Sequence, residues 1–253
     1  MLSIFTKSAG NKTAIDNMFT AGAHFAFSRS RRHPTIAPYI FGVKNKVEIF
    51  DLEKTQNLLG SAKDFIRNIA REGKVILFVG GKSEARNSVK NGALALGMPF
   101  VDGRWIGGTL TNFAQIRKRV EKLEKLTSEK EKGELAKYTK KERLLIDREI
   151  ANLERFFSGI VSMRELPKAL FIVDPKKEKT AVKEALDMHI PVIALSGSDC
   201  NIRGLTYPIV GNDASQTSIQ FFMNEICKAY SDGKALGKSE GHSDIVKTEV
   251  GKV

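Results

Sequence analysis

The chain has 253 residues, 42% hydrophobic and 28% charged, which allows one or two domains with a substantial core and excludes a disordered protein. Lysine and arginine number 41 against 29 aspartate and glutamate residues, and the net charge of +12 favours a polyanionic partner, most simply nucleic acid, over an unspecialised basic surface. The two cysteines form no CxxC pair and no run of about 18 apolar residues occurs, so we predict a cytosolic protein with no membrane partner.

The first 34 residues form a basic N-terminal segment. Apolar spacing over 15–19 predicts a short helix near its middle. Arg29, Arg31 and Arg32 come next, within four residues and directly before a proline that favours extended backbone. Such a loop can be merely solvated, but the clustering of three guanidinium groups favours contact with phosphates.

Alternating apolar residues over 40–50 predict a β-hairpin that carries Lys44 and Lys46 at its turn. Asp51 can cap the next helix, and Gly73 ends it. This helix has a clear apolar stripe, so it is expected to cover a sheet.

A continuous apolar run over 75–79 is typical of a strand buried on both faces of a parallel sheet. A helix over 83–96 stops at Gly97, and the next strand begins at Met98. These elements make a βαβ unit, which indicates a parallel sheet.

Residues 113–157 show two apolar seams with heptad-like spacing, separated by a Lys/Glu-rich stretch. We predict two antiparallel helices, a coiled-coil-like hairpin inserted into the α/β domain. Its first helix carries Arg117, Lys118 and Arg119, which would extend a basic contact surface. A purely solvated outer face is the alternative.

The chain then returns to strands and helices. Strands are predicted over 170–174, 190–195 and 207–210, and helices over 178–188 and from 211–215 onward. The fold class is therefore α/β, a Rossmann-like doubly wound parallel sheet formed by 35–112 and 158–230. The last stretch, 231–253, mixes Gly, Lys, Ser and Glu and predicts a disordered tail.

No catalytic group or metal site is predicted. Gly81-Lys82-Ser83 ends like a phosphate-binding loop, but Ile76 occupies the position where the pattern requires its first glycine. Asp174, Asp199 and Asp213 come after strands, where α/β enzymes place catalytic groups, yet each also fits a turn, loop or helix start. A nucleotide-using Rossmann-fold enzyme remains the alternative.

The stretch 104–113, RWIGGTLTNF, joins the sheet to the hairpin. Its paired glycines allow the chain to turn, and residues 109–112 can cap the first hairpin helix. Trp105 can anchor the core or stack on an exposed base, and the core is favoured. Arg104 is then the better candidate for RNA contact.

This signature resembles that of the bacterial small-subunit ribosomal protein two family. Further matches occur in family order along nearly the whole chain: Ala21-Gly22-Ala23-His24-Phe25, Tyr39-Ile40-Phe41-Gly42, Asn45-Lys46, Leu52-Glu53-Lys54-Thr55, Leu77-Phe78-Val79-Gly80, Leu166-Pro167 and Gly211-Asn212-Asp213. Their order makes chance similarity untenable.

The resemblance implies a non-catalytic structural protein of the small ribosomal subunit, without a cofactor and not a free homo-oligomer. It implies a position between the head and the body of the subunit, contact with small-subunit ribosomal RNA, and support for the docking of the subunit's large OB-fold protein. A free RNA-binding regulator is a further alternative. The predicted RNA-binding residues are Arg29, Arg31, Arg32, Lys44, Lys46, Lys82, Arg104, Arg117, Lys118 and Arg119.

Two segments depart from the family pattern. Where the family continues His-Phe with Gly-His, this chain has Ala26-Phe27, and the family's Ser-Asp-Pro loop is replaced by a stretch that contains Asp199 and Cys200. The family's second histidine, which a metal would involve, is thereby absent, and the late loop is less acidic than in the family. We accordingly transfer no metal site to this chain.

Overall fold

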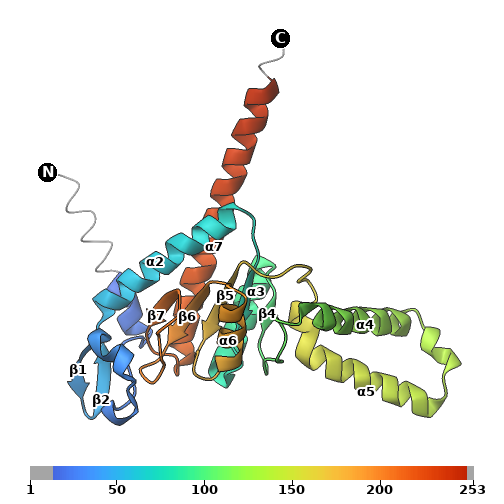
Figure 1. Cartoon of the computed structure of the whole chain (residues 1–253), viewed down its shortest axis with the longest axis horizontal. Coiled ribbons are helices and arrows are strands. Elements are labelled where there is room, and N and C mark those ends of the chain that lie inside the picture. The colour runs from blue at the N-terminus through green and yellow to red at the C-terminus, as the bar shows by residue number, and fades with distance from the viewer. Residues whose placement is uncertain (1–13, 250–253) are drawn as a thin grey trace.

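The computed structural model describes the backbone of residues 14–249 and the side chains of residues 14–237 (Figure 1). A helix over 14–20 precedes the named elements. The main helices are α2 (Leu52–Arg71), α3 (Ser83–Leu96), α4 (Phe113–Glu131), α5 (Lys140–Phe157), α6 (Lys179–Asp187) and α7 (Gln216–Glu249). The strands are β1 (Ile40–Lys44), β2 (Val47–Phe50), β3 (Ile76–Val79), β4 (Phe100–Val101), β5 (Ala169–Val173), β6 (Val192–Ser196) and β7 (Tyr207–Val210).

The described chain forms one five-stranded parallel sheet in the order β4-β3-β5-β6-β7. The three central strands are buried along their whole length, which explains their unbroken apolar sequences. The predicted doubly wound sheet is confirmed. Its order is the flavodoxin-type variant, in which the winding reverses between β3 and β5, and such sheets hold ligands at the carboxyl ends of those strands.

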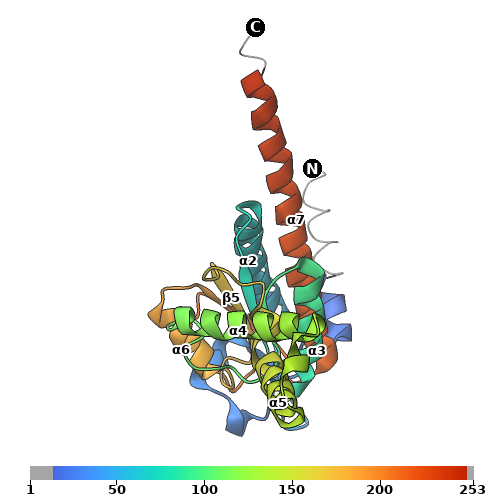
Figure 2. The same ribbon diagram turned by 90° about the vertical axis from the view of Figure 1, so that its right-hand side faces the viewer.

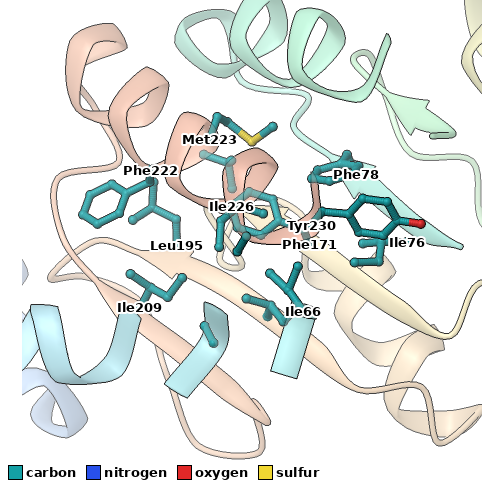
Figure 3. Packing of buried hydrophobic residues seen from close by; sticks show 14 of the residues in the cluster. Ile66, Ile76, Phe78, Phe171, Leu195, Ile209, Phe222, Met223, Ile226 and Tyr230 are labelled. Atoms are coloured by element: carbon teal, nitrogen blue, oxygen red, sulfur yellow. The ribbon is translucent and has the colours of Figure 1, made fainter. Parts of the chain in front are cut away.

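Each face of the sheet has its own core. Alternate strand residues such as Phe78, Phe171 and Leu195 pack under α2, α3 and α7, where Tyr230 is almost fully buried (Figure 3). The opposite residues, such as Leu170, pack against α6 and the base of the α4–α5 hairpin. This division is what doubly wound connections produce.

The β1–β2 hairpin stands beside the sheet, on the side away from α4 and α5 (Figure 1). Its turn uses Asn45 and Lys46, both with positive φ (51° and 64°), as in a two-residue hairpin turn. The backbone of residues 24–27 runs along β2 and adds hydrogen bonds to that edge, including Phe50 N to the His24 carbonyl (2.8 Å). The N-terminal segment is thereby tied to the hairpin.

Helices α4 and α5 lie side by side and project from the sheet (Figures 1 and 2). Their buried side chains continue the second core, and ion pairs join the two helices farther out, among them Lys130 with Asp147 at 2.7 Å. A capping box between Thr139 and Glu142 starts α5. The sequence predicts that residues 109–112 cap α4. In the described structure Asn112 does occupy the N-cap position, but its side chain makes no capping hydrogen bond, so the expected side-chain cap is absent there.

Helix α7 corrects the prediction of a disordered tail. It continues past residue 230 to Glu249, and only 250–253 of that stretch lie outside the described residues. Gly233 and Gly237 face the backbone of α2 so closely that an added Cβ would lie 2.4 Å from the Arg67 carbonyl oxygen and 2.5 Å from that of Arg71. At Gly233 and Gly237, the stretch whose composition resembled a flexible tail makes a close helix–helix contact.

No helix in the described part of the chain combines the length and apolar character that a bilayer crossing requires.

Candidate nucleic-acid interface

Seven of the ten predicted RNA-binding side chains belong to exposed residues. They are Arg29, Arg31, Lys44, Lys46, Arg104, Lys118 and Arg119. The other three, Arg32, Lys82 and Arg117, are partly buried in ion pairs or hydrogen bonds within the protein. Because these three side chains are used internally, they do not carry forward as RNA contacts.

Arg31 and Arg32 are neighbours in the sequence but have different surroundings. Arg32 lies 2.9 Å from Glu48, a carboxylate with no exposed side-chain surface, so it neutralises a buried charge. The Arg31 side chain is 57% exposed, rests on the Phe27 ring at 4.0 Å, and makes a long ion pair with Asp199 at 3.4 Å. Arg31 therefore keeps donors available to an external anion.

The fold places further cations next to this loop. The His33 amide donates to the Ser198 carbonyl at 2.8 Å, which holds the N-terminal loop against the carboxyl edge of the sheet. The loop after β5 brings exposed cations to the same edge, where Lys176 lies 2.8 Å from Asp199 and the Lys177 ammonium donates to the Gly81 carbonyl at 3.3 Å. We call the resulting set the basic rim; it consists of Arg29, Arg31, Lys176 and Lys177.

Sequence reasoning missed Lys176 and Lys177, which lie in the loop after β5 and carry no local pattern. The one available signal was that parallel strands end at a shared edge. Lys176 lies 2.8 Å from Asp199. Burial opposes ionisation of that carboxyl, but Lys176 and then Arg31 outweigh it and lower the pKa of Asp199.

An apolar surface lies on the outer side of the β1–β2 hairpin. It consists of Phe19, Phe25, Phe41 and Val47, all at least 37% exposed, and it borders a cavity of about 570 Å³. His24 lies beneath, stacked on the Phe19 ring with centroids 4.2 Å apart, and burial lowers its pKa. Apolar patches of this kind mark protein contacts more often than RNA contacts.

The signature loop contains the confirmed core anchor. Trp105 is 7% exposed and its indole N–H donates to the Glu184 carboxylate at 3.0 Å. Backbone amides of Gly108 (2.8 Å) and Leu110 (3.0 Å) donate to the same carboxylate. Glu184, on α6, was not singled out by sequence reasoning, because nothing in its local sequence indicates five donors from a loop 74 residues away.

The hairpin offers two exposed cations near its base. Lys118 and Arg119 are exposed, whereas Arg117 donates to the Val161 carbonyl at 3.1 Å and lies 3.6 Å from both Glu121 and Glu124. Arg117 therefore ties α4 to the chain that leaves α5. The three consecutive basic residues do not form one contact surface.

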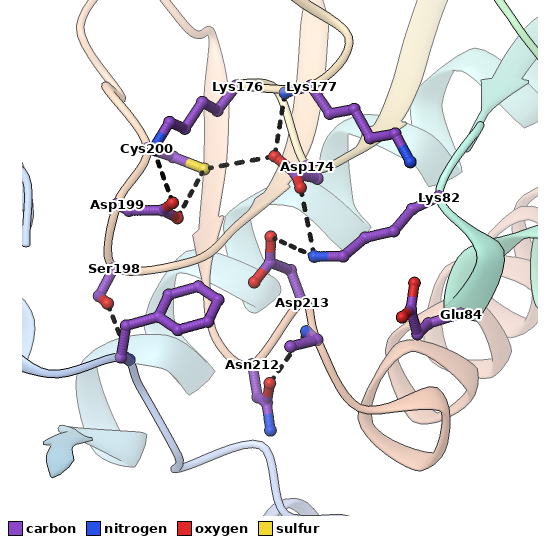
Figure 4. Close-up of polar contacts among 12 residues, drawn as sticks. Lys82, Glu84, Asp174, Lys176, Lys177, Ser198, Asp199, Cys200, Asn212 and Asp213 are labelled. Atoms are coloured by element: carbon purple, nitrogen blue, oxygen red, sulfur yellow. Dashed lines mark hydrogen bonds and ion pairs between the residues drawn. The ribbon is translucent and has the colours of Figure 1, made fainter. Parts of the chain in front are cut away.

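A charged cluster fills the crevice between β3 and β5 (Figure 4). The Lys82 ammonium lies 3.2 Å from Asp174 and 3.4 Å from Asp213, whose side chain is 2% exposed. Burial raises the pKa of Asp213 to about 6, although Lys82 opposes this shift. Asp174 has a left-handed backbone (φ 63°) and also accepts from the Lys177 amide at 3.1 Å.

Asp174, Cys200 and Asp213 place one potential ligand atom each within 4.8 Å of the others. The residues nevertheless do not fit a resident metal. Lys82 already supplies a cation to both carboxylates, and burial strongly raises the pKa of the Cys200 thiol, which opposes formation of the metal-binding thiolate. Phe27, where the family pattern has histidine, lines a neighbouring cavity that also borders Asp213, and it offers no ligand.

The loop after β3 also fails to fit a bound nucleotide. A Cβ at Gly81 would meet the Gly103 carbonyl at 2.4 Å, so the backbone there is already covered. The carboxyl group of Glu178, whose pKa is raised by burial, lies against the same glycine. Asp174 and Asp213 both lie beside Lys82, the residue that follows Gly81 (Figure 4). A phosphate group would meet these acids and an occupied lysine, so the enzyme alternative is not favoured.

Comparison with known proteins agrees with this geometry. The family model described as Ribosomal protein S2 matches residues 18–233. The chain is 43% identical over 230 residues to the small ribosomal subunit protein uS2 of Sulfurimonas denitrificans, covering 91% of this chain and 88% of that protein. It is 42% identical over 221 residues to the uS2 protein of Mesoplasma florum, covering 87% and 83% of the two chains. The uS2 protein of Coprothermobacter proteolyticus is 37% identical over 235 residues, 93% of this chain and 86% of its own length.

Proposed function

The chain belongs to the ribosomal protein S2 family, and from this premise we propose that it is a structural component of the small ribosomal subunit, not an enzyme. The observation that carries the proposal lies at the carboxyl edge of the sheet. The crevice that would hold a small ligand is closed by the Lys82 ion pairs, while the basic rim around it remains exposed. An exposed rim of cations suits the phosphates of ribosomal RNA.

Three separate groups of cations would share this RNA contact. The basic rim supplies the first, Lys44 and Lys46 on the hairpin turn the second, and Arg104 with Lys118 and Arg119 the third. They lie on structures that project from different sides of the sheet. We infer that the protein bridges separated RNA segments, as expected for a protein between the head and the body of the subunit.

Charge reversal in the rim tests the RNA contact. Arg29→Glu combined with Arg31→Glu is expected to weaken incorporation into small subunits about tenfold or more and to lower the salt dependence of binding by about two counterions. Wild-type and variant proteins compete for small subunits stripped of this protein, and sedimentation separates bound from free. A regulator that acts off the ribosome would leave even the wild type in the unbound fraction.

The matched control reverses two exposed lysines on the helices, Lys90→Glu on α3 and Lys228→Glu on α7. It changes the net charge by the same amount away from the rim. If both double variants lost the same affinity, the effect would come from total charge, and the rim would not be an anchor.

We further propose that the apolar surface on the β1–β2 hairpin receives a neighbouring ribosomal protein, the large OB-fold protein. Phe41 is the most exposed residue of this apolar surface, at 79%, and RNA phosphates would not cover such a surface. Burying aromatic side chains at a protein interface is a large favourable term.

Phe41→Asp is expected to reduce the amount of OB-fold protein retained on purified small subunits about 30-fold, the size of a 2 kcal/mol hot spot. The Phe41→Asp protein itself should enter small subunits about as well as the wild type does. Leu94→Asp, which alters a 58% exposed leucine on α3, is the control. Retention of the OB-fold protein at wild-type levels would remove this surface as its docking site.

A further inference from the structure

The loop between β4 and α4 is organised by one buried carboxylate. Glu184 on α6 is 7% exposed, and both of its oxygens accept hydrogen bonds from the loop. One oxygen receives the Trp105 indole N–H at 3.0 Å and the Gly108 amide at 2.8 Å. The other receives the Leu110 amide at 3.0 Å and the amide and hydroxyl of Thr111 at 3.4 and 3.5 Å.

The loop backbone is shaped to point these donors inward. Gly108 has φ of +90°, and the Thr109 amide and hydroxyl both bond to the Ile106 carbonyl, which coils residues 106–110 into a tight turn. The free amides of such a turn face one side, as at the start of a helix, and attract an anion. Here the anion is the protein's own Glu184 carboxylate.

The contacts require a carboxylate. Burial alone would favour the neutral acid, but the hydrogen bonds from Trp105 and the loop amides outweigh it and lower the pKa of Glu184. A glutamine would keep one accepting oxygen and turn an NH₂ donor toward other donors. Two loop donors would then remain buried without an acceptor, which is costly.

The anchored loop positions the residues on either side of it in the chain. Arg104 directly precedes the anchored Trp105, and α4 begins two residues after Thr111. We propose that Glu184 is a positioning residue for RNA binding, because its carboxylate fixes both the direction of Arg104 and the angle at which the α4–α5 hairpin leaves the sheet. This role rests on the proposed RNA contact at Arg104.

The test uses the full chain with Glu184→Gln, and Asp187→Asn as the control. Asp187 is exposed on the same helix, and the control removes the same charge. Trp105 is the protein's single tryptophan, so acrylamide quenching of its fluorescence reports the loop directly. Binding to small subunits stripped of this protein is measured over a range of salt concentrations, for each variant with and without Arg104→Gln.

In the Asp187→Asn background, Arg104→Gln should weaken binding and lower the salt slope by about one. Glu184→Gln should raise the quenching of Trp105 and weaken binding about tenfold at a temperature where circular dichroism shows the folded protein. Adding Arg104→Gln to Glu184→Gln should then change neither affinity nor slope. A loss of stability alone would not remove the Arg104 contribution to the slope.

Unchanged shielding of Trp105 in Glu184→Gln would overturn the anchoring role. Full additivity of the two substitutions would overturn the positioning of Arg104. If Arg104→Gln had no effect even with Glu184 intact, the proposed RNA contact at Arg104 would fail, and the positioning role with it. That outcome is distinguishable, because Glu184→Gln would still expose Trp105.

Discussion

Replacing Lys82 with methionine is expected to lower the free energy of unfolding by about 3 to 5 kcal/mol at pH 7.5, the usual cost of removing one partner from a buried ion pair. Lys82 is 16% exposed and lies within 3.4 Å of both Asp174 and Asp213. Methionine keeps the volume of the lysine stem but leaves two carboxylates in the crevice without their cation. The measurement is urea unfolding, monitored by circular dichroism.

The loss should depend on pH in a defined direction. In the wild type, burial raises the pKa of Asp213 from its ordinary value of 3.8 to about 6, so the folded state holds this proton more tightly than the unfolded state. The stability that protonated Asp213 contributes is therefore fully present below pH 3.8 and is lost as the pH rises through about 6. Without Lys82, which opposes the shift, the pKa of Asp213 rises further.

The difference between wild type and Lys82→Met should consequently shrink between pH 7.5 and pH 5, because protonation of Asp213 removes one of the unpaired charges. Adding Asp213→Asn should recover part of the stability at pH 7.5. An equal loss at both pH values, with no recovery from the second substitution, would mean that Lys82 contributes through packing alone. Incorporation into small subunits should change far less than in the rim variants, since Lys82 faces inward.

The second large effect is expected where α7 crosses α2. Gly233→Ala combined with Gly237→Ala should lower the free energy of unfolding by up to about 4 kcal/mol, because each overpacked site costs about 1 to 3 kcal/mol and each alanine regains about 1 kcal/mol of helix propensity. A Cβ at Gly233 would also lie 2.9 Å from Ala70 Cβ, so the two helix backbones must separate. Thermal unfolding of the double variant and of the wild type measures the change, with the two free energies compared at the same temperature.

Gly60→Ala supplies a control with the opposite sign. Gly60 lies within α2, and no described atom would come within 4 Å of its new Cβ. The same substitution should therefore stabilise the protein by about 0.5 to 1 kcal/mol, through backbone entropy and helix propensity. Stabilisation by all of these substitutions would show that α7 does not press on α2 near residue 233, and that the stretch after residue 230 behaves as the flexible tail its composition suggests.

Local sequence patterns predicted most of the fold. The helix over 83–96 and its stop at Gly97 have the predicted bounds, and Asp51 caps α2 through the Glu53 and Lys54 amides. Trp105 lies in the core, as predicted. These features depend on residues within a few positions of one another, where periodicity, caps and glycine stops act directly.

The candidate site was predicted less well. Arg31 and Arg32 have the same local sequence, yet one reaches solvent and the other neutralises Glu48, 16 positions away. Lys176 and Lys177 carry no motif at all. Whether a cation is free for RNA depends on which acids the fold brings beside it, and a sequence pattern cannot display that.

The sequence by itself determined the α/β class, the order of the elements, the excess of positive charge and the resemblance to a ribosomal family, because each depends on local chemistry or composition. The tertiary structure alone decided which charges remain outside. The order of the strands closes the crevice with Lys82 and surrounds it with the basic rim. The packing of α6 under the signature loop decides that Glu184 receives its five donors. These are contacts between residues far apart in the chain, and only the folded arrangement brings them within hydrogen-bonding distance.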